Sequence, residues 1–383
     1  MLVGAGHAHI EVLRRFGLQT VPGVRLTLVT KGACTPYSGM LPGYVAGHYT
    51  GDEIHIPVAP LAGFANCRLV TAEAVGLEPV DRHVHLQDGG TIAGDVISID
   101  TGATTNLSSA SQFEPYVIPV KPIDRFAENW AHFAKRIRTN PGLQITVVGA
   151  GAAGVELALS IRHRLRRDLS AGGKSIGGRV VLLEKGDQIL RGFSDGVRRR
   201  LSAILLRHNI EVRTNVGKLG FQAEADAGIQ FDLGQFDATF WTTGVCPTDW
   251  LKKSGLAVDE DGFIAVNSQL QSISHPGVFA AGDAAGMIAS PRPKAGVIAV
   301  RQGPILAENL RRAVTGDPLR SFVPQKSWLS LISTGDRYAV ASYGNWAAEG
   351  RWVWYWKNWI DRRFVRRFMF EASETKRFPV NSE

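Results

Sequence analysis

Two short glycine-rich segments are the parts of this sequence best suited to bind a nucleotide. The first, VGAGHAH, contains Gly4 and Gly6, and the second, VGAGAAG, contains Gly149, Gly151 and Gly154. Each follows a short apolar run. Because glycine has no Cβ, the chain can turn tightly there and approach a pyrophosphate, which the N-terminus of the next helix then faces. Each segment therefore predicts a dinucleotide-binding loop between a strand and a helix.

The first loop has His9 where the second has Gly154. Glycine at this position lets the helix pack closely on the strand. A histidine there either fills the space between helix and strand or contacts the phosphate or ribose of a bound nucleotide. The residues alone leave both interpretations open.

An acidic residue at the end of the second strand of such a unit accepts hydrogen bonds from ribose hydroxyls. Glu184 follows the apolar run VVLL and favours NADH, because a carboxylate repels the 2′-phosphate of NADPH. Lys185 follows directly, so NADPH remains an alternative. The matching strand of the first unit ends in Thr30 and Lys31, and we expect the Thr30 hydroxyl to replace the carboxylate there.

Three further apolar runs end in small polar segments, which are Thr101–Gly102, Thr243–Gly244 and Gly282–Asp283. An Asp at such a strand end can accept hydrogen bonds from a polyol, while small neighbours let the ligand lie on the backbone. The alternative for Asp283 is that it only caps a turn. Each of the two Thr-Gly segments is expected to follow a strand and to return the chain across its dinucleotide-binding fold.

Length and composition fit a cytoplasmic α/β protein of two or three domains. The chain has 383 residues, of which 44% are hydrophobic and 42 are glycine. Its three cysteines form no C-x-x-C pair, so neither a metal site nor a disulfide framework is predicted. No apolar run approaches the roughly 18 residues that span a bilayer, and the strand-like start does not read as a signal peptide.

Taken in order, these segments resemble the flavoprotein family with two dinucleotide-binding domains, which includes type II NADH dehydrogenases, sulfide:quinone reductases and disulfide reductases. The resemblance covers roughly residues 1–345 and implies FAD at the first loop and at Gly282–Asp283, with NADH at the second loop. The stretches VGAGHAHIEVLRRFG and CTPYSGMLPGYVAGHY are also similar to the pyridine nucleotide-disulfide oxidoreductase-type domain found fused N-terminal to selenide, water dikinase.

The resemblance implies an α/β fold with two Rossmann-like dinucleotide-binding domains, the second inserted in the first. We expect a discontinuous FAD-binding domain over residues 1–118 and 256–318, and an NAD(P)H-binding domain over 119–255. Residues 319–383 would form a C-terminal region with β-strands and an amphipathic tail.

The family likeness also assigns residues to the reacting centre. The loop that begins with Thr35 and Pro36 would lie along the flavin ring. Glu156 would lie beside nicotinamide and flavin, although an acid early in a helix also favours the helix dipole without any catalytic role. Lys294 would stabilise negative charge on reduced flavin, or it is simply solvated. Gln302 would border the acceptor pocket.

The acceptor is less defined than the cofactors. Type II NADH dehydrogenases carry further glutamines on the helix of Gln302, where this chain has Val297 and Arg301. The leading hypothesis is hydride transfer from NADH to FAD and then electron transfer to a quinone-type acceptor. The alternatives are a soluble NAD(P)H-dependent reductase of a sulfur or selenium compound and a non-enzymatic redox-sensing flavoprotein. Cys34 lacks the partner cysteine or the position that disulfide reductases need.

The C-terminal segment RWVWYWKNWIDRRFVRRFMF combines aromatic residues with positive charge. On a helix, Trp352, Tyr355, Trp356, Trp359 and Ile360 would share one face, and six cations against one acid leave a net charge of +5. This pattern predicts peripheral attachment to the cytoplasmic face of a membrane. The alternative is a helix that packs on the flavin domain or forms a homodimer contact. No nucleic-acid-binding motif accompanies the charge.

Overall fold

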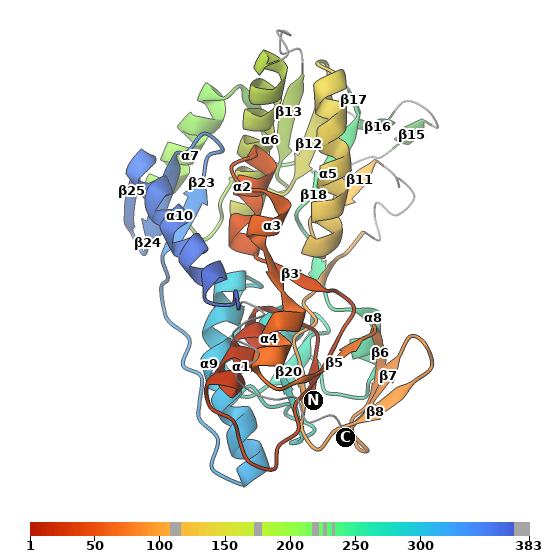
Figure 1. Ribbon diagram of the computed structural model, residues 1–383. Helices are drawn as coiled ribbons and strands as arrows, with labels where there is room; N and C mark the ends of the chain where they lie inside the picture. The colour runs from red at the N-terminus through yellow and green to blue at the C-terminus, as the bar shows by residue number, and fades with distance from the viewer. Residues whose placement is uncertain (108–115, 172–177, 217–221, 225–227, 232–233, 371–383) are drawn as a thin grey trace.

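The protein has two lobes, each built around a five-stranded parallel sheet (Figure 1). The computed structural model describes residues 1–107, 116–171, 178–216, 222–224, 228–231 and 234–370. Within them, no helix is long and apolar enough to cross a bilayer, and no cluster of three metal-ligating side chains is found.

The sheet of the first lobe has the strand order β21-β9-β1-β2-β5, and every neighbouring pair is parallel. Its strands are β1 (Leu2–Val3), β2 (Thr27–Thr30), β5 (Arg68–Thr71), β9 (Ile97–Ile99) and β21 (Val278–Ala280). Residue Val278 pairs with Ile97, so the segment after the second lobe returns to the first sheet. Helices α1 (His7–Leu18) and α9 (Gly296–Thr315) pack side by side against this sheet, with α4 (Val58–Phe64) beside them.

The sheet of the second lobe has the strand order β11-β18-β12-β13-β14 and is also parallel. Its strands are β11 (Val117–Pro119), β12 (Gln144–Val148), β13 (Arg179–Leu183), β14 (Ile210–Arg213) and β18 (Ala238–Trp241). The expected boundary between residues 118 and 119 falls inside β11, which pairs with β18 and so lies in the second sheet. Helices α5 (Ile123–Thr139), α6 (Ala152–Ala171) and α7 (Asp195–Arg207) cover this lobe.

The helices and strands follow the apolar pattern of the sequence. Strand β12 is buried over four consecutive residues, as expected for a parallel strand covered on both faces. Helix α5 buries Phe126, Trp130, Phe133 and Ile137, which recur every three or four residues and therefore share one face.

Shorter elements complete the two lobes. The antiparallel sheet β6 (Ala74–Glu78), β7 (His83–Leu86) and β8 (Thr91–Ala93) extends the first lobe, which also contains the pairs β3 (Cys34–Pro36) with β4 (His55–Pro57) and β20 (Ile264–Val266) with β22 (Ala285–Met287). Strand β10 (Thr104–Thr105) follows one Thr-Gly segment and pairs with β19 (Val245–Cys246), which follows the other. The remaining elements are α2 (Leu41–Ala46), α3 (Gly51–Ile54), α8 (Asp249–Lys253), β15 (Gln222–Glu224), β16 (Gly228–Phe231) and β17 (Gly234–Phe236).

The C-terminal region is a three-stranded antiparallel sheet followed by a helix. The sheet contains β23 (Ser330–Ser333), β24 (Ala339–Tyr343) and β25 (Trp346–Gly350), and the helix is α10 (Arg351–Arg366). The buried face of α10 packs Val353 and Trp354 on the sheet, and it also buries Asp361, Phe364 and Val365. The opposite face exposes Trp352, Tyr355, Trp356 and Trp359, each by more than a third. Ile360, expected on that aromatic face, instead lines the large cavity described below.

Candidate functional site

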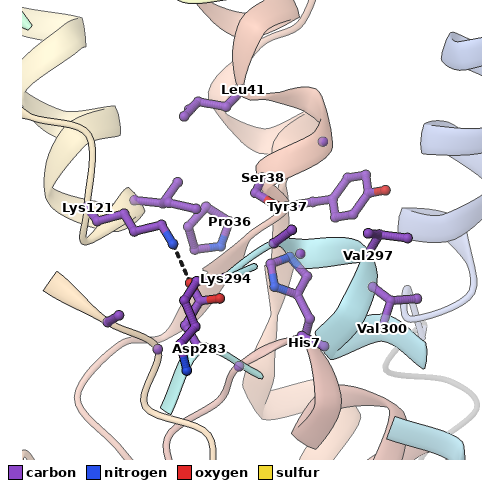
Figure 2. Close-up of a pocket in the computed structure, with 18 of the residues that line it drawn as sticks. His7, Pro36, Tyr37, Ser38, Leu41, Lys121, Asp283, Lys294, Val297 and Val300 are labelled. Atoms are coloured by element: carbon purple, nitrogen blue, oxygen red, sulfur yellow. Dashed lines mark hydrogen bonds and ion pairs between the residues drawn. The ribbon is translucent and has the colours of Figure 1, made fainter. Parts of the chain in front are cut away.

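A cavity of about 1230 Å³ lies between the two lobes and the C-terminal region. Its wall includes the first glycine loop, the loop after β3, the N-terminal turns of α6 and α9, the start of strand β23 with the segment before it, and residues of α10. Figure 2 shows labelled side chains from the start of α1, the loop after β3, the start of α9 and the segments of Lys121 and Asp283 around one space. Of the predicted site residues, those that line the cavity are Gly4, Gly6, Thr30, Thr35, Pro36, Thr101, Gly102, Glu156, Asp283 and Lys294.

The first glycine loop turns as expected and is fastened to β9. Gly4 has a φ of +86°, which favours glycine, and the amide of Gly6 donates to the Asp100 carbonyl at 3.1 Å. The Asp100 carboxylate accepts from the backbone amides of Ala8 (2.8 Å) and His9 (3.1 Å) and so caps the N-terminus of α1. Burial raises the pKa of Asp100 to about 7, although these two amides oppose the shift.

Asp100 is a residue that our sequence reasoning missed. The signal was its position directly before Thr101–Gly102, at the end of an apolar run. A Cβ on Gly6 or on Gly282 would clash with its carboxylate. The glycines at these two positions therefore make room for an acid as well as for a nucleotide.

His9 holds the first loop to the sheet. Its Nδ1 donates to the Gly4 carbonyl at 2.6 Å, and its Nε2 accepts from the Ser98 hydroxyl at 2.8 Å. Burial lowers the pKa of His9 to about 4, so the ring is neutral at neutral pH. His9 is absent from the cavity wall, and this geometry supports the packing interpretation over a nucleotide contact.

Asp283 faces the cavity and forms an ion pair with Lys121, which comes from the segment between β11 and α5 (Figure 2). The neighbouring Gly282 amide donates to Oε1 of Gln302 at 2.7 Å. Nε2 of Gln302 contacts the Met287 sulfur, and the side chain is buried away from the cavity. Gln302 thus positions the Gly-Asp turn, and its geometry does not support the expected contact with an acceptor.

Lys294 borders the cavity, but its ammonium group is engaged elsewhere. It donates to the Ala285 carbonyl at 2.5 Å and lies 3.6 Å from the ring centroid of Phe263. Burial lowers the pKa of Lys294 to about 8, with nearby Asp side chains opposing the shift. These contacts favour a structural role, and the cation that pairs with Asp283 in the cavity is Lys121.

The loop after β3 is anchored to the first glycine loop. Thr35 is buried, and its hydroxyl donates to the Ala5 carbonyl at 2.5 Å. At the opposite end of the cavity, Thr30 is followed by Lys31, whose ammonium lies 3.9 Å from the carboxylates of Glu73 and Asp124. Glu73 also lines the cavity, so an acid does lie near the end of β2. It is supplied by the segment after β5, which the sequence pattern of a single βαβ unit did not reveal.

The second glycine loop has the form expected of a nucleotide site. Gly149 has a φ of +100°, and a Cβ on Gly154 would clash with the Gly149 carbonyl. A Cβ on Gly151 would meet nothing within 4 Å, so the loop is open on that side. The Glu184 carboxylate accepts from the amides of Ala150 (2.8 Å) and Gly186 (2.9 Å), which places it at the loop as predicted.

Thr243 and Gly244 lie behind this loop. The Thr243 methyl group lies where a Cβ on Gly149 would be, and Gly244 has a φ of +70°. Neither residue lines the large cavity. The Thr243–Gly244 segment therefore forms the expected turn and contacts the second glycine loop.

Glu156 faces the cavity from the first turns of α6. Its Oε1 accepts from the Ser333 amide of β23 at 2.8 Å. Burial raises the pKa of Glu156 to about 7, against the opposing effects of the Lys357 ammonium and the Ser333 amide. An acid in this state exchanges a proton near neutral pH.

Lys357 reaches the same region from α10. Its ammonium donates to the Gly39 carbonyl at 2.5 Å and to the Asp361 carboxylate at 2.6 Å. Burial acts against its charge, but Asp361 and Glu156 outweigh burial and hold the pKa of Lys357 above its usual value. Sequence reasoning counted Lys357 among the six cations of the C-terminal segment and did not connect it with the cavity.

Comparisons with known proteins agree with this architecture. The family model described as "Pyridine nucleotide-disulphide oxidoreductase" matches residues 1–303. NADH dehydrogenase-like protein YutJ of Bacillus subtilis is 22% identical over 335 residues, which are 85% of this chain and 86% of that protein. Demethylphylloquinone reductase NdbB of Synechocystis is 28% identical over 244 residues, or 61% of this chain and 58% of the relative.

Solved structures extend the likeness to the whole chain. The structure of NDH2 from Plasmodium falciparum in complex with NADH has a TM-score of 0.80 at 16% identity, covering 100% of this chain and 99% of that one. Sulfide:quinone oxidoreductase from Aquifex aeolicus has a TM-score of 0.78 at 18% identity, covering 98% and 93%. The likeness to a domain fused to selenide, water dikinase stays a prediction. With its two dinucleotide folds and a family match over most of its length, this chain belongs to the pyridine nucleotide-disulphide oxidoreductase family.

Proposed function

We propose that this protein is an FAD-dependent NADH dehydrogenase that passes electrons to a quinone-type acceptor. The observation that carries the proposal is the single cavity that joins the first glycine loop to the N-terminal turns of α6. Hydride transfer requires the two reacting rings to meet, and one space shared by both lobes permits that meeting. The relatives named for NADH dehydrogenase and for demethylphylloquinone reductase support both halves of the reaction.

The residues of the first lobe fit FAD. Gly4 and Gly6 form a tight turn at the N-terminus of α1, and a Cβ on Gly102 would meet nothing within 4 Å. Asp283 offers a carboxylate within the same cavity, in a position to accept hydrogen bonds from a polyol chain. When bound, FAD supplies the ring that accepts hydride and releases electrons singly or in pairs.

The protein contributes binding, orientation and a place for a proton. Reduction of a quinone to a quinol by NADH takes up one proton from the surroundings. Asp100 and Glu156 both line the cavity with a pKa raised to about 7, but the Asp100 carboxylate caps α1, so Glu156 is the better suited of the two to that task. The Ser333 amide holds its carboxylate in place, and the charge of Lys357 limits how far the pKa rises.

Glu184 favours NADH over NADPH. Its carboxylate is held at the second loop by the amides of Ala150 and Gly186, and it would face the ribose hydroxyls of the nucleotide. A 2′-phosphate at this place would meet a fixed negative charge. Replacing Glu184 with Gln should therefore narrow the preference for NADH.

Helix α10 supports attachment to a membrane surface on the cytoplasmic side. Its exposed face carries four aromatic side chains together with Arg363 and Arg366, while the opposite face is buried against the protein. Aromatic and cationic side chains on one helix face suit the boundary between headgroups and acyl chains. A quinone acceptor dissolved in the bilayer would then lie close to the cavity that α10 helps to line.

Anaerobic stopped-flow spectroscopy tests the reaction directly. Mixing the FAD-bound protein with NADH should bleach the flavin absorbance near 450 nm rapidly, and a short-chain quinone should restore it. Bleaching by neither NADH nor NADPH would overturn the dehydrogenase. Bleaching followed by reoxidation only by a disulfide or a selenium compound would retain the dehydrogenase half and overturn the quinone half.

A further inference from the structure

We propose that a second pocket, separate from the dinucleotide cavity, binds a phosphate-bearing anion. This anion pocket has a volume of about 310 Å³ and lies between the segment from Tyr44 to Tyr49, helix α5 and helix α6. Its volume is at the lower end of the range for small-molecule sites. None of the residues that line it is assigned to the FAD or NADH site above.

Charge is the first observation that supports the proposal. Four cationic side chains line the anion pocket, and they are Lys135, Arg138, Arg164 and Arg167. No acidic side chain is among the lining residues, all of which the structure describes. Asp168 lies beside them and bonds Nε of Arg164 at 2.6 Å and Nε of Arg167 at 3.0 Å. The lining residues together with Asp168 therefore carry more positive than negative charge.

The second observation is that the pocket is partly preorganised. Nη1 of Arg167 donates to the Gly47 carbonyl at 2.8 Å and to the Ala46 carbonyl at 3.3 Å. Gly47 has a φ of +79°, and a Cβ there would clash with the guanidinium. Asp168 holds Arg164 at the same time. Guanidinium groups fixed in this way recognise phosphate oxygens with less loss of side-chain entropy than mobile lysines.

The third observation is the position of the pocket next to α10. Tyr49 lines the pocket, and its hydroxyl donates to Oδ1 of Asn358 on α10 at 2.8 Å. Arg362 of α10 lies over the Tyr49 ring at 5.3 Å and pairs with Glu53 of α3 at 2.8 Å. Figure 1 shows α10 and α5 on either side of α2 and α3. The anion pocket therefore adjoins the helix whose aromatic face we assign to a membrane surface.

Two sources could supply the phosphate, which are the headgroup of an anionic lipid and a free phosphate compound. Both present a charged phosphoryl group to the same cations. A lipid headgroup as the source of the phosphate depends on the membrane attachment proposed above. A free phosphate compound as the source does not depend on it, so the anion pocket and the proposed membrane attachment can fail separately.

The test compares two double variants of the FAD-bound full chain. Lys135→Gln with Arg138→Gln removes two cations of the pocket. Arg125→Gln with Arg136→Gln removes two exposed cations of the same helix that do not line it. Each protein is titrated with inorganic phosphate at constant ionic strength, followed by thermal unfolding, and with equimolar phosphatidylglycerol–phosphatidylcholine vesicles, followed by sedimentation. NADH oxidation should stay unchanged in both variants and serves as the control for folding.

The pocket variant should lose roughly tenfold to thirtyfold in vesicle affinity, at about 1 kcal/mol per cation, and the control variant at least threefold less than that. A difference seen with vesicles alone supports the lipid headgroup. A phosphate-induced stabilisation that the pocket variant lacks supports a site for free phosphate. Equal losses of vesicle affinity in the two variants, together with no stabilisation by phosphate beyond that by chloride, would overturn the anion pocket, because diffuse surface charge would then explain the data.

Discussion

At the scale of single residues, Glu156 combines a place in the cavity wall with a pKa raised by burial to about 7. The unfolded chain would release this proton near pH 4.5. Between these two values the folded state binds more protons than the unfolded state, so the free energy of unfolding falls as pH rises. The loss is complete above pH 7 and amounts to about 2–3 kcal/mol.

We therefore expect Glu156→Gln to match the wild type in stability at pH 4.5 and to exceed it by about 2–3 kcal/mol at pH 8. Urea unfolding at both pH values measures this difference. Asp100 has the same direction of pKa shift, so a residual slope should remain in the variant. Glu128→Gln, which removes an exposed carboxylate of α5, should change neither value, and a gain in that control would contradict the assignment.

His9 provides a second residue-scale prediction, because the common residue at its position is glycine. His9→Gly removes two buried hydrogen bonds and leaves a void between α1 and β9. We expect a loss of about 2–4 kcal/mol in the free energy of unfolding. Denaturant titration of the FAD-free and FAD-bound protein would show the loss in both forms. A loss confined to the FAD-bound form would instead mean that His9 contacts the nucleotide.

At the scale of the element, one face of α10 is buried against the protein and the other is exposed. Trp352 is 54% exposed and Trp359 is 56% exposed, whereas Asp361 and Phe364 are buried. Replacing both tryptophans with serine should weaken binding to anionic vesicles by about thirtyfold, at roughly 1 kcal/mol for each half-buried ring. Val80→Ser, at an exposed turn of the first lobe, is the matched control and should bind like the wild type. Unchanged binding by the tryptophan variant would place the membrane contact elsewhere.

At the scale of the whole molecule, the proposed membrane attachment would combine the net charge of +8 with the aromatic face of α10. Raising the salt from about 0.1 M to 1 M shortens the Debye length from about 10 Å to 3 Å and removes most of the attraction to anionic vesicles. The affinity of the wild type for anionic vesicles should fall steeply as salt rises and then level off, because the apolar contribution does not depend on screening. The plateau should vanish in the double tryptophan variant. Binding that falls to zero in the wild type would exclude an apolar contribution.

The large-scale plan of the fold could be predicted because it rests on local patterns. Glycine loops after apolar strands identified both dinucleotide folds, and the late Gly282–Asp283 segment implied the return of β21 to the first sheet. The expected boundary at residue 118 falls inside β11, because the pairing of β11 with β18 depends on contacts far apart in the sequence. Periodicity predicted four of the five residues expected on the exposed face of α10, whereas Ile360 lines the cavity.

The details of the site could not be predicted as well, since they depend on which segments meet in space. Asp100, Glu73, Lys121 and Lys357 reach the cavity or its loops from segments that carry no motif of their own. Gln302 and Lys294 occupy the predicted helix and its approach, but their polar atoms turn to Gly282 and Ala285. A sequence shows that a polar residue lies near a site, whereas the direction of its side chain is settled by tertiary contacts.

The bond between Lys357 and the Gly39 carbonyl has a practical consequence for anyone who wants a detergent-free enzyme. Deleting a membrane-binding C-terminal helix is the usual first step. Deleting α10, however, would also remove part of the cavity wall and release the loop that should support the flavin. Such a truncated preparation would lose turnover for reasons unrelated to lipid. Surface redesign of the four exposed aromatic positions, with the inner face of α10 left intact, is the route to a soluble and still active preparation.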